Sequence, residues 1–579
     1  MKPSQRWAIV LVNFFALSWG SEPRLTTPFP ELLVDPVPIC LVAPPVPAMR
    51  VDTLEWRMGP VRYRFDVPRV PQSHARREFL CYNLVFEQGL RYLPLFEWQA
   101  SGERSVLRAP GEPRGVAVLF VGDVVGGYEF LRQLEYAPLP LRTYPVWSVE
   151  ASAFPLTPVY VRPEQLPDHP AALLGIPFIV LADGAERLNE SQQRALVLWL
   201  HAGGQLIVPI RPSASLLRRT RLAPYLPEWS ELRIQRLTQP VKLFSTQVPP
   251  PSVPVPVAWL RHPRGAPCAQ VGQRTLALQV PWGFGTLSVF GGDLMHPAWR
   301  NWEGQATLWK ALLNRPRFPI ATLAQLTSTP ELPSTQAKQR IAAAPWLVAI
   351  SALYVSALYA LWRILRAQRR LIYAPYGVAL LSGLSVLAIY FAAPPEPRGT
   401  SLSGVRLILG VGTHALERAE YSYRSPSGEW TLRWRPTDAL AVVPLIALNP
   451  IQATFTTEGT TIRGNSLIPD QLILYTLTQA PAPMRVERIS TGYRLRNLSE
   501  NLTFQQVRIY RYHDLRPLAE DKPAENKRAR DLEKSLFKLA PGDTVELPYE
   551  PSRSYVLCAS AQASIDSSVE EVALWLFYP

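Results

Sequence analysis

Few side chains in the sequence could take part in covalent chemistry. Cys268 follows the stretch RHPRGAP, and His262 lies shortly before it. A thiolate beside an imidazole base is the arrangement of a cysteine nucleophile. The other histidines nearby, His201 and His296, do not lie in an H-x-E setting. Cys268 with His262 is therefore one candidate pair, and a buried core thiol is the alternative.

Two carboxylates form the other chemical candidate, a ligand crevice. Asp123 ends the apolar run GVAVLFVGD, and Asp183 lies at the end of the run PFIVLAD. In open α/β sheets, ligands bind outside the carboxyl ends of the strands. Each aspartate is also a common turn or cap residue, which is the alternative. The residues after Asp123 lack the hydroxyls that would ligate magnesium, so no metal site and no cofactor are expected.

Strands and a helix must position these carboxylates. Continuous apolar runs at 115–123, 177–188 and 205–210 are typical of strands buried on both faces of a parallel sheet. Between the last two, SQQRALVLWLHAGG has helical spacing, with Asn189 as N-cap and Gln192 completing a capping box. The alternation of strands and helices predicts an α/β fold.

One part of this pattern resembles a known fold. The stretches FIVLADGAERLNESQQRALVLWLHAGGQLIVPI and GFGTLSVFGGD are similar to the class I glutamine amidotransferase-like proteins, whose parallel sheet is flavodoxin-like. In active members, the strand after the AGG-like turn leads to a nucleophile elbow that carries cysteine. Here that strand runs into Val208–Pro212, with no cysteine or serine at the turn. The resemblance implies a scaffold without its catalytic nucleophile, and fold alone implies no activity.

The apolar segments predict a membrane protein. Residues 1–20 have the charged start, apolar centre and small residues of a signal peptide. Residues 345–362 and 371–393 are long and apolar enough for transmembrane helices. The short connector, 363–370, carries positive charge, which marks a cytoplasmic loop. Its topology determinants are Arg363, Arg366, Arg369 and Arg370. Both large soluble regions would then lie outside the bacterial cytoplasmic membrane.

The remaining segments complete a multidomain plan. An N-terminal β-rich region is expected at 21–110, the amidotransferase-like α/β domain at 111–320 and a linker at 321–344. After the hairpin, short alternating runs separated by turn residues predict a β-sandwich-like domain at 394–579. It resembles the immunoglobulin-like sandwiches of exported proteins. The expected fold class is thus a parallel α/β sheet, a two-helix transmembrane hairpin and a β-sandwich.

Composition excludes or leaves open several further classes. The net charge is +14, but the arginines are scattered, so no nucleic acid partner is expected. Cys40 and Cys81 could form a disulfide in an oxidising compartment, although isolated buried thiols are an equal alternative. A carboxylate, Asp293, lies near several tryptophans in DLMHPAWRNWEGQATLW. Carbohydrate stacking is one interpretation, and a core aromatic cluster is the favoured one.

The whole arrangement resembles bacterial envelope membrane proteins with a degenerate amidotransferase-like domain. That resemblance implies contact with membrane lipid and with other envelope proteins, but no particular activity. We therefore expect a membrane-anchored extracytoplasmic protein with a non-catalytic binding or envelope-assembly role. The alternative is an envelope hydrolase or amidotransferase-like enzyme with a non-standard site, such as one built on Cys268.

Overall fold

The structure is a computed structural model that describes part of the chain. The described residues are separate strands between 24 and 108, then 116–136 and 154–313 almost without gaps, then 352–368 and 374–392, and most of 402–511 and 539–577. They form two compact units. The first joins Met1–Ser328 with Leu402–Pro579, and the second is Thr329–Ser401.

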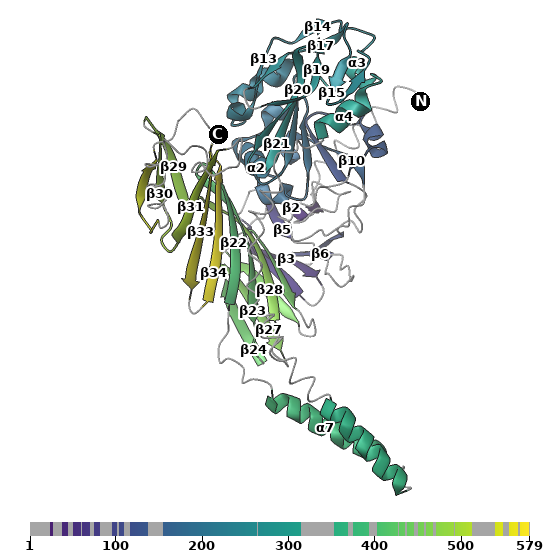
Figure 1. Cartoon of the computed structure of the whole chain (residues 1–579), viewed down its shortest axis with the longest axis vertical. Coiled ribbons are helices and arrows are strands. Elements are labelled where there is room, and N and C mark those ends of the chain that lie inside the picture. The colour runs from purple at the N-terminus through teal and green to yellow at the C-terminus, as the bar shows by residue number, and fades with distance from the viewer. Residues whose placement is uncertain are drawn as a thin grey trace, which may run out of the picture. The chain divides into compact units, whose positions relative to one another are not determined.

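The α/β part of the first unit is built on one mixed ten-stranded sheet (Figure 1). Its middle strands are parallel neighbours, in the order β10-β8-β11-β12-β21. Their bounds are Phe154–Val161, Val116–Val121, Phe178–Leu181, Gln205–Pro209 and Gly285–Phe290. The antiparallel edge strands are β9 (Glu135–Tyr136), β20 (Arg274–Trp282), β19 (Ala266–Val271), β15 (Val241–Leu243) and β16 (Thr246–Val248).

Short helices and strand pairs surround this sheet. The α-helices are α2 (Glu190–His201), α3 (Pro297–Arg300) and α4 (Gln305–Leu313). The 3-10 helices are η1 (Glu129–Gln133), η2 (Pro163–Gln165), η3 (Pro170–Leu173), η4 (Ala185–Arg187), η5 (Pro212–Arg219) and η6 (Ala223–Tyr225). Two small pairs join β13 (Glu228–Trp229) to β18 (Leu260–Arg261), and β14 (Arg233–Gln235) to β17 (Val255–Val257).

The expected parallel sheet is wrong, because five of the nine strand pairings in this sheet are antiparallel. A tight turn at Gly283, which has a φ of 62°, sends β21 back beside β20. Only glycine adopts a positive φ there without steric cost. Strands β19, β15 and β16 then continue the sheet with antiparallel pairing. The fold of the first unit is therefore made mostly of strands arranged in several mixed sheets.

Strands from both ends of the chain form one β-sandwich part. One seven-stranded sheet has the order β24-β27-β26-β4-β3-β6-β7, in which the N-terminal β4 pairs in parallel with the C-terminal β26. The bounds are Gly428–Trp434, Gly459–Ser466, Ile451–Thr456, Val61–Arg69, Arg50–Met58, Leu95–Ala100 and Glu103–Arg108. In Figure 1 the purple strand β3 lies in the same part of the molecule as the green strand β27, with which it shares a sheet.

The other sheets of this part come mainly from the C-terminal residues. A second seven-stranded sheet has the order β25-β28-β23-β22-β34-β33-β31. Its bounds are Ala439–Pro444, Gln471–Pro481, His414–Arg424, Leu402–Val411, Ser568–Phe577, Tyr555–Ile565 and Thr503–Arg511. Two three-stranded sheets are β1-β2-β5 (Arg24–Thr26, Val37–Ala43, Ala75–Cys81) and β29-β30-β32 (Met484–Ile489, Gly492–Asn497, Thr544–Leu547).

Aromatic side chains of one large sheet pack into the core of the sandwich, and one of them contacts the other large sheet. Trp56 stacks on Tyr63 with ring centroids 4.6 Å apart, and Phe65 stacks on Phe455 at 4.0 Å. The hydroxyl of Tyr63 accepts a hydrogen bond from the backbone N–H of Val442, which lies in the opposite sheet. Offset stacking and shared burial stabilise such cores. The N-terminal strands are therefore part of the same core as the C-terminal ones.

The second unit holds two helices, residues 352–367 and α7 (Ala374–Ala392). They pack where a Cβ on Gly377 would meet the side chain of Leu361 at 2.5 Å, and the hydroxyls of Tyr354 and Ser382 lie 2.9 Å apart. The first helix takes in Arg363 and Arg366, which the sequence analysis placed in a loop. Arg366 lies over the ring of Trp362, with the guanidinium carbon 5.0 Å from the ring centroid.

The helices of the second unit contradict the predicted transmembrane hairpin. Within the described residues, none of the helices combines the length and the apolar character that a bilayer crossing requires. The two-helix transmembrane hairpin at 345–362 and 371–393 is therefore wrong. The cytoplasmic loop at 363–370 and the bacterial cytoplasmic membrane location, which rest on that hairpin, are wrong with it. Physically, the first helix continues through charged Arg363 and Arg366 instead of ending before them.

Three sequence predictions fall partly or wholly outside the described residues. The signal peptide at 1–20, the linker at 321–344, and Arg369 with Arg370 all lie there. The backbone at Cys40 and Cys81 is described, in the adjacent strands β2 and β5. Cys40 is register partner of Glu78, and Cys81 of Val37. The cysteines are thus not directly opposite each other, and their disulfide stays a prediction.

Candidate functional site

The two predicted carboxylates lie side by side at the point in the parallel sheet where the strand order reverses. The chain passes from β8 to β10 on one side and then to β11 on the other side of β8, which makes β8 and β11 the switch point. Asp123 follows β8, and Asp183 follows β11. The backbone N–H of Asp123 donates to the carbonyl of Asp183 at 2.7 Å. The structure therefore brings together the residues that the sequence singled out for a crevice.

Asp123 is neutralised by an arginine of the chain. Its Oδ1 lies 2.5 Å from Nη2 of Arg187, and both side chains are about half exposed, at 55% and 51%. Arg187 also lies 3.7 Å from Glu164. A Cβ on Gly184 would lie 2.6 Å from Oδ2 of Asp123, so the absence of a side chain at this residue, whose φ is 90°, leaves room for the pair. Exposed pairs of this kind contribute little stability. Because the Asp123 side chain is about half exposed, it remains accessible to a ligand.

Asp183 is held by a buried arginine from the turn after β12. Nε of Arg211 lies 2.6 Å from Oδ1 of Asp183, and its Nη2 lies 3.2 Å from Glu186. Nη1 of Arg211 donates to the carbonyl of Leu181, and the side chain is fully buried. The hydroxyl of Ser213 donates to Asp183 and accepts from Arg211. A buried guanidinium needs this number of partners.

Sequence reasoning did not find Arg211 as part of the site. It noticed the turn only for lacking a cysteine. The signal was present, however, because an arginine two residues after the five buried residues of β12, and next to buried Ile210, cannot be left unpaired in an apolar layer. The acidic residues in DGAE, at the end of the neighbouring strand, are the partners that such an arginine needs.

A third carboxylate, Asp293, lies nearby after β21. Its pKa is raised above the usual value, first by burial and then by the charge of Asp183, while Arg211 lowers it. Its Oδ1 accepts a hydrogen bond from the backbone N–H of Met295 at 2.9 Å. The strand ends thus carry a carboxylate rim, here defined as Asp123, Asp183 and Asp293. Within the described residues, no three His, Cys, Asp or Glu side chains are grouped so that they could hold a metal ion.

The tryptophans near Asp293 belong to the core. Trp299 and Trp309 are each 1% exposed and Trp302 is 7% exposed. The indole N–H of Trp299 donates to the carbonyl of Pro256, and that of Trp302 to the carbonyl of Pro249. These rings are used for packing and backbone contacts, so they do not form a platform for sugar stacking.

The candidate nucleophile and bases lie in apolar surroundings. Cys268 is in β19, is 1% exposed, and burial raises the pKa of its thiol to about 12. A thiol in this state is neither ionised nor accessible at neutral pH. The ring of His262 lies 6.5 Å from that of Trp282. His201 is also buried, and burial lowers its pKa to about 3.

Comparisons with known proteins provide no assignment. No family model matches the chain, and no curated protein matches it. Cytoplasmic Protein STM1381 from Salmonella typhimurium LT2 is 15% identical, covering 34% of this chain and 98% of its own, with a TM-score of 0.25. Cytoplasmic Protein STM3548 from Salmonella typhimurium is 15% identical over 34% of this chain and 97% of its own, with a TM-score of 0.23. Exo-beta-1,4-mannosidase Op5Man5 from Opitutaceae bacterium strain TAV5 is 16% identical over 27% and 28%, with a TM-score of 0.19.

TM-scores this low carry no argument about fold or activity. The expected resemblance to bacterial envelope membrane proteins with an amidotransferase-like domain is wrong. No family model matches the chain, and no helix in the described part of the chain has the character that such membrane proteins need. What remains for a functional argument is the geometry of this chain's own side chains.

Proposed function

We propose that the chain is a non-catalytic binding protein. The observation that carries the proposal is the pairing of Arg211, which lies in the turn where active amidotransferase-like proteins have their nucleophile. Its side chain is fully buried and is paired with Asp183 and Glu186. An ion pair of this kind fixes the strand ends, but it leaves no nucleophile or base free at that turn.

The state of Cys268 and of His201 supports the same proposal. A nucleophile must reach its substrate and must be ionised or have a base beside it. Cys268 is nearly inaccessible, and its raised pKa keeps it protonated. His201 is buried and neutral. A hydrolase built on Cys268 would first need a rearrangement of β19.

The carboxylate rim is the proposed binding surface of the α/β part. Asp123 and Asp183 are 55% and 54% exposed, so each has oxygen surface that the arginines do not cover. Carboxylates accept hydrogen bonds from hydroxyl and ammonium groups. The rim lies at the switch point of the parallel strands, where α/β sheets take their ligands. We therefore assign it a small ligand rich in hydroxyl or ammonium groups.

Labelling with electrophiles tests the non-catalytic assignment. The folded chain would be treated at pH 7.5 with iodoacetamide and with a fluorophosphonate probe, and Cys268 and Ser213 would be followed by peptide mass spectrometry. We expect no labelling of either residue in the folded state and alkylation of Cys268 in denaturant. Cys268→Ala and Ser213→Ala provide matched controls for the two peptides. Stoichiometric labelling of Cys268 or Ser213 in the folded protein would overturn the proposal.

A second experiment tests the rim. Ribose, glucose and spermidine would be titrated against the chain by calorimetry, beside Asp123→Asn and the matched variant Glu164→Gln. Glu164 contacts the same arginine from a greater distance, so its replacement changes charge without removing the rim carboxylate. We expect at least one probe to bind with a dissociation constant below about 1 mM, weakened by Asp123→Asn and not by Glu164→Gln. Equal effects of the two variants would remove the rim from the proposal.

A further inference from the structure

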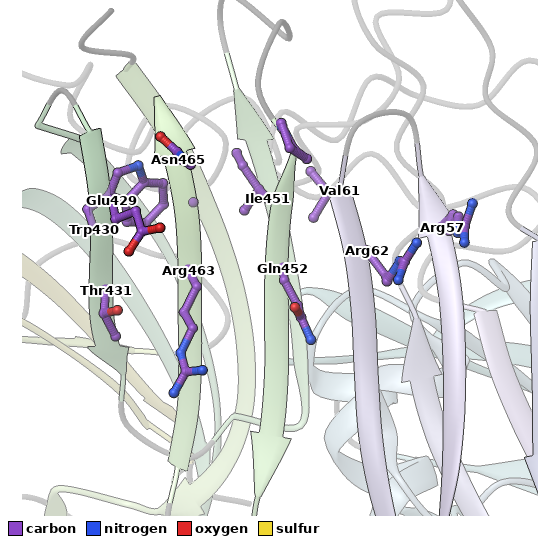
Figure 2. A pocket seen from close by; sticks show the side chains of 12 residues that line it. Arg57, Val61, Arg62, Glu429, Trp430, Thr431, Ile451, Gln452, Arg463 and Asn465 are labelled. Atoms are coloured by element: carbon purple, nitrogen blue, oxygen red, sulfur yellow. The ribbon is translucent and has the colours of Figure 1, made fainter. Parts of the chain in front are cut away.

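A hollow lies on the outer face of the sheet formed by β24, β27, β26, β4 and β3 (Figure 2). Its volume is about 590 Å³. This size is in the range of sites for small ligands rather than for a nucleic acid duplex. Three of its lining side chains are arginines, namely Arg57, Arg62 and Arg463.

Strand register places these arginines in one row across the sheet. Arg57 pairs with Arg62 across β3 and β4, and Arg62 pairs with Gln452 across β4 and β26. Gln452 then pairs with Arg463 in β27, and Arg463 pairs with Thr431 in β24. Neighbouring strands are about 4.8 Å apart. The backbone positions of Arg57 and Arg62 are thus about 5 Å apart, and those of Arg62 and Arg463 about 10 Å apart.

The alternation of each strand turns this row outward. Arg57, Arg62 and Arg463 are exposed, whereas the residues beside them in sequence, Trp56, Val61 and Ile462, are buried in the sandwich core. Directly opposite residues share one face of a sheet. We name the five side chains Arg57, Arg62, Gln452, Arg463 and Thr431 the arginine row, and all of them can donate hydrogen bonds.

The charge of the row is not balanced. Like charges directly opposite each other in a sheet are destabilising, and Arg57 faces Arg62 in this way. Within the described residues, no ion pair to Arg57, Arg62 or Arg463 is formed. The next row on the same face differs, because there Arg64 lies opposite Glu55. Among the described residues, the only carboxylate that lines the hollow belongs to Glu429, which pairs with Asn465 in the row beyond Thr431.

We infer that the arginine row binds a linear oligophosphate. Guanidinium groups form two parallel hydrogen bonds to phosphate oxygens, and three of them along one line match a ligand that carries negative charge at short intervals. Gln452 fills the gap between Arg62 and Arg463 with a further donor. This site goes beyond the binding proposed for the carboxylate rim, and it uses none of the same residues.

The lack of an exposed aromatic ring among the described residues of the hollow favours a phosphate chain as the ligand over a nucleotide or a nucleic acid single strand. Recognition of bases relies on exposed aromatic rings for stacking. The one aromatic residue that lines the hollow, Trp430, is 6% exposed and packs toward Tyr423 inside the sandwich, with ring centroids 5.7 Å apart. The outer face therefore offers charge and hydrogen-bond donors without a stacking platform.

Calorimetry with inorganic tripolyphosphate tests the site in the full-length chain. We expect binding at 50 mM salt that weakens at least about tenfold in the double variant Arg62→Gln with Arg463→Gln. Arg261→Gln, which removes an exposed arginine outside the hollow, should change the affinity by less than about twofold. Arg62→Lys keeps the charge but loses the two-pronged contact, so its affinity should be intermediate.

Three outcomes would overturn the inference. One is the absence of tripolyphosphate binding, and another is an equal loss in Arg261→Gln and in the double variant. The third is tighter, Arg62-dependent binding of a hexaglutamate peptide or of a thymidine oligonucleotide, which would assign the row to another anion. Circular dichroism of each variant checks the fold, and loss of structure in the double variant would shift the test to Arg62→Lys.

Discussion

The guanidinium of Arg211 reaches from the turn after β12 to the carboxylate of Asp183 at the end of β11, with Nε 2.6 Å from Oδ1. The arginine end of this pair is fully buried, whereas the aspartate end is half exposed to solvent. It connects two neighbouring strands at the edge where a ligand would approach. The same contact therefore holds the sheet together and orients the carboxylate rim.

Replacing Arg211 with methionine should destabilise the α/β part strongly. The change leaves the buried carbonyl of Leu181 and the 19% exposed side chain of Glu186 without their donor, and removal of one partner from a buried pair typically costs about 3–5 kcal/mol. Arg187→Met is the matched control, because its pair with Asp123 is exposed and should contribute little stability. Urea unfolding followed by tryptophan fluorescence measures both. Similar losses for the two variants would show that Arg211 is not buried as described.

Replacement of Asn189 tests the capping box of α2, which the sequence predicted completely. Its side chain accepts from the N–H of Gln192 at 2.9 Å, and the amide oxygen of Gln192 accepts from the N–H of Asn189 at 2.9 Å. The capping box predicted from these two residues is confirmed. Asn189→Ala should cost about 1 kcal/mol in the free energy of unfolding, and Asn189→Asp should cost much less because it keeps the acceptor. An alanine variant as stable as the aspartate variant would contradict this role.

Local signals of this kind were readable because they depend on residues close in sequence. The buried strands β8, β11 and β12 lie inside the apolar runs at 115–123, 177–188 and 205–210. The same strands set the positions of Asp123 and Asp183. The carboxylate rim could therefore be predicted in part from local pattern alone.

Pairing between distant strands was not readable. The alternation in Val61–Arg69 indicates a strand with one buried face, but nothing in it says that its partner is Ile451–Thr456, beyond the α/β part. Likewise, Arg57, Arg62 and Arg463 look like scattered surface charge until the register aligns them. The arginine row forms only when strands distant in sequence pair with each other, so no local sequence motif predicts it.

His201 should make the stability of the chain depend on pH. Burial lowers its pKa to about 3, whereas the unfolded value is about 6.5. Between these values the unfolded chain binds one more proton than the folded chain. Stability is therefore retained above about pH 6.5 and falls as the pH drops, by about 1.4 kcal/mol per pH unit from this group. His201→Leu removes that contribution.

Chemical unfolding of both proteins at pH 7.5, 6.5 and 5.5 measures the effect. The difference in unfolding free energy between wild type and His201→Leu should be constant from pH 7.5 to about 6.5 and should then shift in favour of the variant. The constant part reports the change in packing beside Tyr225 and Trp282, whose rings lie 5.5 Å and 6.4 Å from that of His201. A difference that does not vary with pH would mean that His201 titrates normally in the folded chain.

Arg62 offers the converse case, a residue whose replacement should stabilise the free protein. It lies directly opposite Arg57 with no acidic partner within the described residues, and such like-charge pairs are unfavourable by several tenths of a kcal/mol. Arg62→Thr replaces the charge with a residue that suits an exposed strand position, so we expect a gain of about 0.5 kcal/mol, largest at low salt. Arg64→Thr is the control, because Arg64 faces Glu55 and its loss should not stabilise. Thermal unfolding at 20 mM and 500 mM salt decides between them. A gain for Arg62→Thr that disappears at high tripolyphosphate would also show that the anion binds the wild type more tightly than the variant, because a ligand adds more stability to the folded chain that binds it more tightly.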